Sequence, residues 1–461
     1  MALDTPAGFC EAELLAATER SAAAGVELLS QLVTIPSLSL PGSDRSILER
    51  SAKTVFKAFS DLWDWDFCEV VSADGGAPAL LARKNPSPGR PTVLLYAHHD
   101  VQPEGDLSLW KSAPFEPVVR EGRLYGRGSA DDAAGIVLHA RALGALAEVA
   151  GGAAGLGVVL CIEGEEESGS PTFSSLLARY REILESDLIV VADSDNPSPD
   201  VPALTTSLRG VVGVTVELST LRQSVHSGLF GGPTPDALTS LIRMLAALLH
   251  PDGSVAVEGL DTGEVAAARL DEEVFRAEAG LLEGVGLWGR GSLAHRLWWA
   301  PALTVTGLDA PEVAKASNTL LARASAKVSL RIPPGMSTAH ARECLETHLR
   351  NNADTGVQLS FRDWEEGEGY AQDPGHPTIE LVRAALREGY GNPVVEQGIG
   401  GSIPFVAALH HAFPDVPIAI VGVEDRQSAA HGPNESVDLA MIDRAVRAEV
   451  LILARMLGAG A

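Results

Sequence analysis

The 461-residue chain contains only four cysteines, which are far apart and include no Cys-x-x-Cys pair. This spacing argues against a disulfide framework, so we expect reduced, structural thiols. Basic residues are also scarce, with 35 Lys and Arg against 61 Asp and Glu and a formal net charge of -26. Because this charge repels phosphate backbones and anionic lipid surfaces, it argues against nucleic acid and membranes as partners.

Long apolar runs are absent as well, since no stretch approaches the ~20 residues that a membrane helix needs. The N-terminal stretch MALDTPAGFCEAELLAATERS has early acidic residues and lacks the basic and apolar regions of a signal peptide. We therefore expect a cytoplasmic protein. What the chain does have is 46% hydrophobic residues over a length that exceeds one usual core, which predicts two globular domains.

Four short apolar runs predict buried parallel strands, because they are apolar on both faces. They cover residues Thr92–Tyr96, Gly157–Ile162, Leu188–Ala192 and Ile418–Val423. Helix-like segments alternate with these runs, at Ser46–Phe59, Ala133–Val149 and Thr172–Leu184. This strand-helix alternation predicts an α/β domain with a central, mostly parallel sheet.

From Val211 the pattern changes to that of a small α+β domain inserted into the first one. Strand-like stretches VVGVTVEL, AKVSLRI and VQLSF alternate with predicted helices at 235–249 and 338–349. An acidic, Gly-rich connector, RDWEEGEGYAQDPGHP, then leads back to the sheet. The predicted boundaries are 1–209 and 371–461 for the α/β domain and 210–370 for the insertion, which is expected to move as a lid.

Candidate chemistry lies just past the carboxyl ends of predicted strands, where open α/β sheets build their sites. His98 and Asp100 follow the strand TVLLY and point the same way in an extended backbone. Asp100 can therefore accept a hydrogen bond that orients a metal-bound His98. Alone, this His-x-Asp pattern is weak, because a lone histidine is more often a satisfied core residue.

Two acidic motifs add further candidates. In GRGSADDAAG the pair Asp131 and Asp132 opens a predicted helix, where an aspartate either caps the helix or bridges two metals. In EGEEESGS the neighbours Glu166 and Glu167 follow a predicted strand. One of them can hold a metal while the other serves as a base, and the alternative is a solvated acidic loop.

Asp193 and Asp195 in VVADSDNP, together with His431 in SAAHGPNES, complete a set of carboxylates and imidazoles without thiolate. Such a set suits Zn²⁺, Mn²⁺ or Co²⁺ rather than Cu(I) or an iron-sulfur cluster. Individually, each of these residues also fits an ordinary turn.

Taken together, the motifs occur in the order found in one known family. They are YAHHDVQP, WKSAPFEPVVREGRLYGRGSADD, EGEEESGS, TTSLRG, HSGLFGG, SLRIPPG, GGSIP and HGPNES. The chain resembles the dinuclear-zinc peptidases of the carnosine dipeptidase and cytosolic non-specific dipeptidase type, which are related to aminoacylase and carboxypeptidase G. The resemblance spans nearly the whole chain.

The resemblance implies a zinc-peptidase catalytic domain that holds two divalent metal ions, zinc first, with manganese or cobalt as alternatives. Its implied ligands are His98 and Asp193 for one metal, Glu167 and His431 for the other, and Asp131 as the bridge. Asp193 is preferred over Asp195 because it directly ends the strand and keeps the family's distance to LRG. The implied general base is Glu166, and Asp100 is the partner of His98.

For the inserted domain, the resemblance implies a ferredoxin-like lid that also dimerises. His226 resembles the histidine that stabilises the oxyanion in the neighbouring subunit's site, and Arg331 resembles the residue that holds the substrate's free carboxylate. These roles imply a homodimer. Further positions resemble substrate contacts, although turn, cap or packing roles are open for them: Thr319, His376, Gly400, Gly401 and Ser402.

The expected activity is hydrolysis of dipeptides with a free C-terminal carboxylate. One departure from the family is that Ala133 and Ala134 follow the Asp pair, where relatives commonly carry a lysine, and this leaves the substrate preference open. The same metal pair would also support N-acyl-amino-acid deacylation or release of a C-terminal glutamate-type residue. A non-catalytic metal-binding homologue is the remote alternative, and the presence of both Glu166 and Asp100 argues against it.

Overall fold

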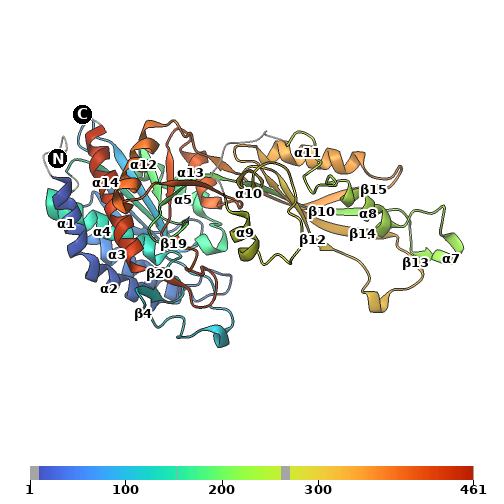
Figure 1. Ribbon diagram of the computed structural model, residues 1–461, viewed down its shortest axis with the longest axis horizontal. Coiled ribbons are helices and arrows are strands. Elements are labelled where there is room, and N and C mark those ends of the chain that lie inside the picture. Colours follow the sequence, from blue (N-terminus) through green and yellow to red (C-terminus); the bar gives the residue numbers. More distant parts are fainter. Residues whose placement is uncertain (1–9, 153, 261–269, 460–461) are drawn as a thin grey trace. The chain divides into compact units, whose positions relative to one another are not determined.

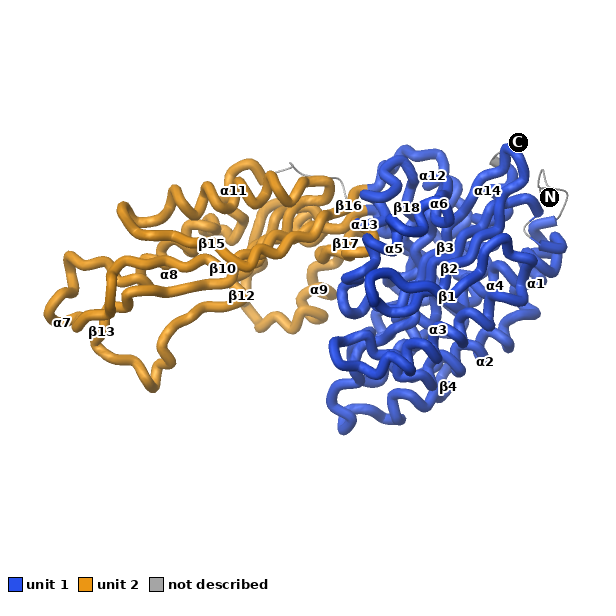
Figure 2. The backbone as a smooth tube through the Cα atoms, turned by 180° about the vertical axis from the view of Figure 1, so that it is seen from behind, with its two compact units in different colours: residues 1–206, 372–396, 408–461 blue, residues 207–371, 397–407 orange. Residues whose placement is uncertain are grey.

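The computed structural model describes residues 10–152, 154–260 and 270–459. Residues 1–9, on which the expected lack of a signal peptide partly rests, lie outside this range. The chain forms two compact units, coloured separately in Figure 2. Unit 1 comprises Met1–Thr206, Gln372–Glu396 and Ala408–Ala461, and unit 2 comprises Ser207–Ala371 and Gln397–Ala407.

Unit 1 is built around a sheet whose central strands are parallel (Figure 1). Its strand order is β1-β2-β6-β3-β7-β18-β9-β16, with β3 parallel to β6 and β7, and β18 parallel to β7. The last strand, β16 (Tyr370–Ala371), is antiparallel to β9. The apolar runs form β3 (Thr92–His98), β6 (Gly157–Glu163), β7 (Leu188–Val191) and β18 (Ile418–Val421). The predicted mostly parallel sheet is therefore confirmed. Its antiparallel strands are β1 (Phe67–Val71), β2 (Ala79–Lys84) and β9 (Ala203–Leu208).

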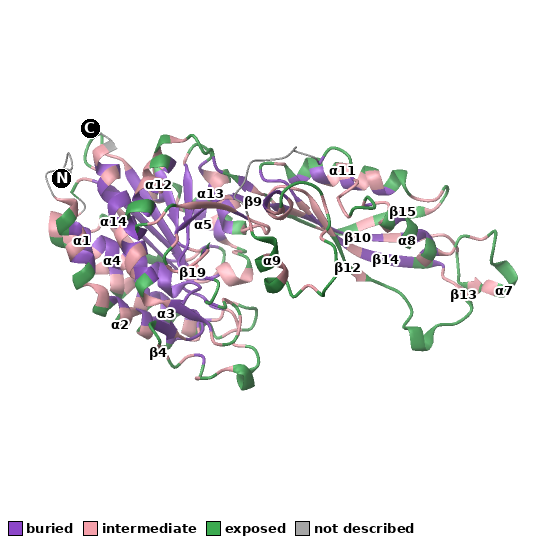
Figure 3. Cartoon of the chain, in the orientation of Figure 1, coloured by how far each residue is buried: buried purple, intermediate pink, exposed green. Residues whose placement is uncertain are grey.

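The central strands are buried along their whole length (Figure 3), as expected for a sheet covered on both faces. Their apolar side chains join those of the helices in one large core cluster. The long helices of unit 1 are α1 (Glu11–Arg20), α2 (Ala22–Val33), α3 (Arg45–Ser60), α4 (Ala133–Ala150), α12 (Pro377–Tyr390) and α14 (Leu439–Ala459).

Two details of unit 1 differ from the sequence-based prediction. The helix expected over Thr172–Leu184 is divided at Tyr180 into α5 (Phe173–Arg179) and α6 (Arg181–Leu184), and its N-cap Thr172 makes no side-chain cap hydrogen bond. Helix α4 is long and apolar enough to cross a membrane, although no membrane-length run was expected. Of its residues 67% are buried, and it packs against α1, α2, α14 and β3, so its composition is that of a core helix.

Unit 2 contains a four-stranded antiparallel sheet in the order β12-β14-β10-β15. Helices α8 and α11 contact this sheet and supply part of a separate hydrophobic core. The chain order is strand, helix, two strands, helix, strand, which is the ferredoxin-like arrangement. The elements are β10 (Gly210–Ser219), α8 (Ala237–Ala246), β12 (Ala302–Leu308), β14 (Arg323–Ile332), α11 (Thr338–Asn351) and β15 (Gln358–Gly367).

The sequence reading missed β12 and the two helices before it, α9 (Glu272–Glu278) and α10 (Leu293–Trp298). Strand β12 lies at the sheet edge and is largely exposed, so it lacks the buried face that marks a strand in sequence. Residues Gln397–Ala407 also belong to unit 2, although the predicted boundary placed them in the α/β domain. Within unit 2 they contact Arg209, whose backbone N–H and Nε donate to the carbonyls of Ile399 and Gly400 at 3.2 and 3.0 Å.

Candidate dinuclear metal site

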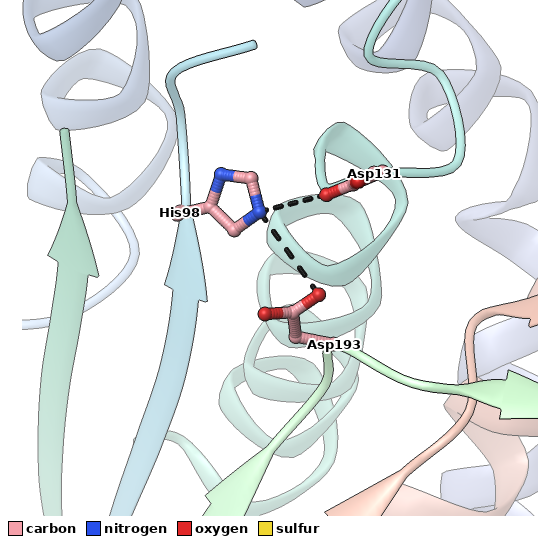
Figure 4. Close-up of side chains that lie close together, drawn as sticks. All are labelled: His98, Asp131 and Asp193. Atoms are coloured by element: carbon pink, nitrogen blue, oxygen red, sulfur yellow. Dashed lines mark hydrogen bonds and ion pairs between the residues drawn. The ribbon is translucent and has the colours of Figure 1, made fainter. Parts of the chain in front are cut away.

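The carboxyl ends of β3 and β7 bring a histidine and two carboxylates together in unit 1. His98 ends β3, Asp193 follows β7, and Asp131 lies in the turn before α4. The His98 Nε2 atom is 2.8 Å from Asp131 Oδ1 and 4.0 Å from Asp193 Oδ1 (Figure 4). These three residues offer ligand atoms that all lie within 4.8 Å of one another, and we call them group 1.

A second group forms around the other oxygen of Asp131. Asp131 Oδ2 is 2.8 Å from His431 Nε2, which in turn lies 3.2 Å from Glu167 Oε2. Asp131, Glu167 and His431 meet the same 4.8 Å criterion, and we call them group 2. Because one carboxylate faces both imidazoles with different oxygens, the two groups share a single aspartate, which is the arrangement that a bridge between two metals requires.

Asp100 fixes the first histidine and the turn that carries the glutamates. Its Oδ1 atom is 3.3 Å from His98 Nδ1, and the two carboxylate oxygens accept the backbone N–H groups of Glu166 and Glu167 at 3.1 and 3.0 Å. With Nδ1 directed at Asp100, the Nε2 atom of His98 is directed at group 1. Asp100 therefore orients candidate ligands without belonging to either group.

The acidic run EGEEESGS is divided between structural and site carboxylates. Glu163 accepts a hydrogen bond from the buried Tyr96 hydroxyl at 2.7 Å, and Glu165 accepts from Ala77 N and Thr172 N at 2.9 and 2.7 Å. Glu167 belongs to group 2, and carboxylates of both groups raise the pKa of Glu166 by electrostatic repulsion. The alternative of a solvated acidic loop is therefore wrong for this segment.

The Asp pair before α4 is divided in the same way. Asp132 is the N-cap of α4, where its Oδ1 accepts from Gly135 N at 3.0 Å and its Oδ2 accepts from His98 N at 3.1 Å. Asp131 instead faces the two histidines. Ala133 and Ala134, which follow the Asp pair, are buried in the first turn of the helix and join the core.

Burial and like charge make the site strongly electronegative. Burial, together with repulsion from Asp193, Asp131 and Glu167, raises the pKa of Glu166 to about 9. Burial and repulsion from Asp131 and Glu167 also raise the pKa of Asp193 to about 7, although His98 opposes the shift. Hydrogen bonds to Asp131 and Glu167 raise the pKa of His431 to about 10.

This donor set fits divalent cations. Carboxylates crowded in a buried site without enough positive charge are stabilised by a bound cation, and the donor spacing matches metal-ligand distances of ~2.0–2.2 Å. The donors are oxygen and imidazole nitrogen, which suit zinc, manganese or cobalt. Asp195, the alternative ligand candidate, is exposed on β8 (Asp195–Asn196) and lies outside both groups.

Sequence reasoning missed Gln102, which holds Glu167. The Gln102 backbone N–H donates to Glu167 Oε1 at 3.0 Å, and its side-chain Nε2 donates to Oε2 at 2.8 Å. It also missed Glu424, a carboxylate of β19 (Glu424–Asp425). Burial and repulsion from Asp131 and Asp193 raise the pKa of Glu424 well above its usual range. Gln102 lies within the quoted motif YAHHDVQP, but nothing in the motif separates it from a turn residue.

The predicted lid and substrate residues lie mostly in unit 2. His226 and Thr319 are brought together because β11 (Val225–His226) pairs with β13 (Thr319–Leu320). Arg331 lies on β14 opposite Val211 and Ala302. Gly400, Gly401 and Ser402 follow β17 (Val395–Ile399), which pairs with β9. His376 belongs to unit 1, where its Nδ1 accepts from Thr378 N and caps α12.

The covered α/β sheet gathers imidazole and carboxylate donors around one shared aspartate, a donor set for a pair of divalent metal ions. The family model for "Peptidase family M20/M25/M40" matches residues 94–455, and the chain belongs to this family of metallopeptidases. The resemblance inferred from the motifs is thereby confirmed.

The chain is also similar to individual proteins of known activity or structure. The chain is 35% identical over 382 residues to the cysteinylglycine-S-conjugate dipeptidase of Corynebacterium striatum, covering 82% of this chain and 84% of that protein. Two solved structures share the fold. The dipeptidase Dug1p of Saccharomyces cerevisiae is 21% identical with a TM-score of 0.69, covering 97% of this chain and 98% of that one. The M20 metallo-carboxypeptidase Sso-CP2 of Sulfolobus solfataricus is 20% identical with a TM-score of 0.77, covering 94% and 99%.

Proposed function

We propose that this protein is a dinuclear metallodipeptidase that hydrolyses dipeptides with a free C-terminal carboxylate. The observation that carries the proposal is the pair of ligand groups that share Asp131. Glu166 is the sequence neighbour of Glu167, and its backbone N–H donates to Asp100, the partner of His98, at 3.1 Å. The 35% identity to a curated dipeptidase supports dipeptides over the N-acyl and glutamate-type alternatives. Both alternatives use the same metal chemistry, so the choice among them rests on the substrate's termini.

His98, Asp131 and Asp193 would hold one divalent ion, and Asp131, Glu167 and His431 would hold the other. Zinc is the first candidate, and manganese or cobalt fit the same donors. When bound, the ions lower the pKa of a water and polarise the peptide carbonyl. Asp100 keeps His98 oriented and Gln102 keeps Glu167 in place throughout the reaction.

Glu166 is the general base in this mechanism. It takes a proton from the attacking water and delivers it to the leaving amine as the peptide bond breaks. Burial and the neighbouring carboxylates raise the pKa of Glu166 to about 9. Cations that neutralise those neighbours remove the repulsion, which lets Glu166 act as a base near neutral pH.

Unit 2 is proposed to supply the substrate-binding groups as a lid. Arg331 holds the C-terminal carboxylate, because a guanidinium fork matches a carboxylate with two hydrogen bonds. Gly401, Ser402 and Thr319 line the substrate, and His376 contributes from unit 1. Among the described residues the Arg331 guanidinium makes no hydrogen bond or ion pair, so a substrate carboxylate need not displace a protein partner.

Replacing Arg331 with Ala should raise KM for unblocked dipeptides by about 10- to 100-fold, the loss of a charged hydrogen-bond pair. Rates would be measured on unblocked dipeptides, C-terminally amidated dipeptides and N-acetyl amino acids. The native enzyme should prefer the free carboxylate, and the variant should lose that preference. Arg323→Ala, at the other end of β14, is the matched control and should keep it. A native preference for N-acetyl amino acids would instead assign a deacylase.

His226 is proposed to act in the site of a second subunit, which makes the protein a homodimer. Its Nδ1 accepts the Gly228 N–H at 3.0 Å, so the neutral ring carries its proton on Nε2 and can donate to an oxyanion. The adjacent helix α7 (Ser227–Phe230) exposes Leu229 and Phe230 by 78% and 51%. Exposed apolar side chains next to a functional histidine support a contact with another chain.

Mixing two inactive variants tests this arrangement. His226→Ala should lower kcat by about 10²–10³-fold, the usual loss of one oxyanion donor, and leave metal content unchanged. Refolding it with an equal amount of Glu166→Gln protein should restore about one quarter of native activity, because half the dimers are mixed and each has one intact site. His340→Ala, an exposed histidine of the same unit, is the control. No recovery in the mixture would contradict action between subunits.

A further inference from the structure

Glu435 is a fully buried carboxylate that lies outside both ligand groups. Its side chain is 0% exposed and accepts hydrogen bonds at both oxygens. Oε2 accepts from Gly128 N at 2.9 Å and from Arg127 Nη1 at 2.6 Å. Oε1 accepts from Ala130 N at 3.0 Å and from Asp131 N at 3.2 Å. The carboxylate therefore fills the turn that presents the shared aspartate.

These contacts fix the backbone on which Asp131 stands. The N–H groups of residues 128, 130 and 131 converge on one acceptor pair, and the turn has no other acceptor for them among the hydrogen bonds of the described residues. A buried carboxylate is strongly disfavoured unless it is paired, and the buried Arg127 guanidinium supplies the charge partner. Removing either member leaves an uncompensated charge inside the unit.

The same pair also reaches the other ligand segments. Glu435 lies four residues after His431, and the Arg127 Nη2 atom donates to the carbonyl of Gly432, next to His431, at 3.2 Å. Nη2 also donates to the carbonyl of Pro103 at 3.1 Å, beside Gln102. One ion pair thus connects the segments that carry Asp131, His431 and the Gln102 support of Glu167.

We propose that the Glu435–Arg127 pair is a positioning clamp on which binding of both metals depends. It rests on the dinuclear site of the proposed function. By holding Asp131 between His98 and His431, the clamp sets the shared ligand for group 1 and group 2 at once. Apart from their own ion pair, the hydrogen bonds given above for Glu435 and Arg127 all go to backbone groups, so both act through the backbone that bears the ligands.

Gln102 provides an internal contrast, because among the described residues its side chain makes hydrogen bonds with Glu167 alone. Its loss should therefore weaken group 2 alone. Glu449 provides a matched control of another kind. It is a buried carboxylate, 2% exposed, and it pairs with the buried His139 at 2.8 Å. Within the described part of the chain it makes no hydrogen bond to a turn that carries a candidate ligand. Its loss should lower stability as loss of Glu435 does, without changing the metal sites.

The experiment measures zinc binding by competition with a chelator of known affinity, and zinc release from the loaded protein into excess chelator. Glu435→Gln places an amide NH₂ against N–H donors and should weaken both zinc sites by about 10- to 100-fold, the usual effect of outer-shell partners. Gln102→Ala should weaken one site only. Glu449→Gln should leave both constants within about twofold while lowering Tm. Arg127→Lys, which keeps the charge but cannot reach all three acceptors, should weaken both sites less than Glu435→Gln.

The outcomes separate the two proposals. If the native protein binds two zinc ions and Glu435→Gln binds them as tightly while its Tm falls like that of Glu449→Gln, the clamp is only structural and the inference is overturned. If Glu435→Gln does not fold, unchanged constants in folded Arg127→Lys overturn it equally. If the native protein binds no divalent metal, the proposed function itself fails.

Discussion

Glu166→Gln protein is expected to retain zinc but to turn over dipeptides about 10²–10⁴-fold more slowly, the contribution of a positioned general base. The substitution keeps the shape of the side chain and removes only its capacity to take a proton. Because Glu166 lies outside both ligand groups, the five candidate ligands stay in place. The loss should therefore appear in kcat, measured together with zinc content on the same sample.

Glu165→Gln is the control for this substitution. The Glu165 carboxylate accepts hydrogen bonds from Ala77 N, Thr172 N and the Thr172 hydroxyl. It therefore supports the turn rather than the reaction. Its loss should lower Tm, at a cost of about 1–3 kcal/mol for the unsatisfied donors, with kcat reduced less than tenfold. A Glu166→Gln enzyme with more than one tenth of native kcat would falsify the general-base assignment.

Removing the metals should produce the second large effect. Protein treated with a chelator and freed of it is expected to lose dipeptide hydrolysis by about 10³-fold or more, because several kcal/mol of transition-state stabilisation disappear. Its Tm should also fall, since a ligand present at 100 times its Kd stabilises the folded state by about 2.7 kcal/mol per site. Activity and Tm would be followed as zinc, manganese or cobalt is added back.

Magnesium is the control in the add-back series, because it prefers six oxygen ligands and fits an imidazole-containing set poorly. The best metal should restore both activity and Tm, and the activity should rise with the second equivalent rather than the first. Full activity after complete metal removal would contradict a metal-dependent mechanism.

The sequence was sufficient for the sheet and for the residues at its edge. Runs that are apolar on both faces, such as Leu188–Val191, can hardly be anything but covered strands, and parallel strands end at a common edge. His98 ends one such strand and Asp193 lies just after another, so their proximity could be predicted from the strand order. The different roles of Asp131 and Asp132 could not be predicted from the sequence, because adjacent aspartates differ only in the direction in which the turn points their side chains.

The residues that support the candidate ligands could not be predicted from the sequence, for a different reason. Glu435 acts on a turn more than 300 positions earlier in the chain, and its partners are backbone N–H groups that leave no mark in the sequence. Strand β12 was missed because an exposed edge strand has no buried face to give it periodicity. Contacts of long sequence separation and polar elements thus escape a reading based on local pattern.

The position of β18 in unit 1 has a consequence for biosynthesis. This strand lies between β7 and β9 although it is translated more than 200 residues after them, so the nascent chain carries an open gap in its sheet until Ile418–Val421 leaves the ribosome. Unpaired strand edges invite aggregation during that interval. The inserted unit, whose sheet strands are contiguous in the chain, can fold in the meantime. Because β18 and the candidate ligand His431 both lie late in the chain, hydrolytic activity should appear only after these residues have been translated.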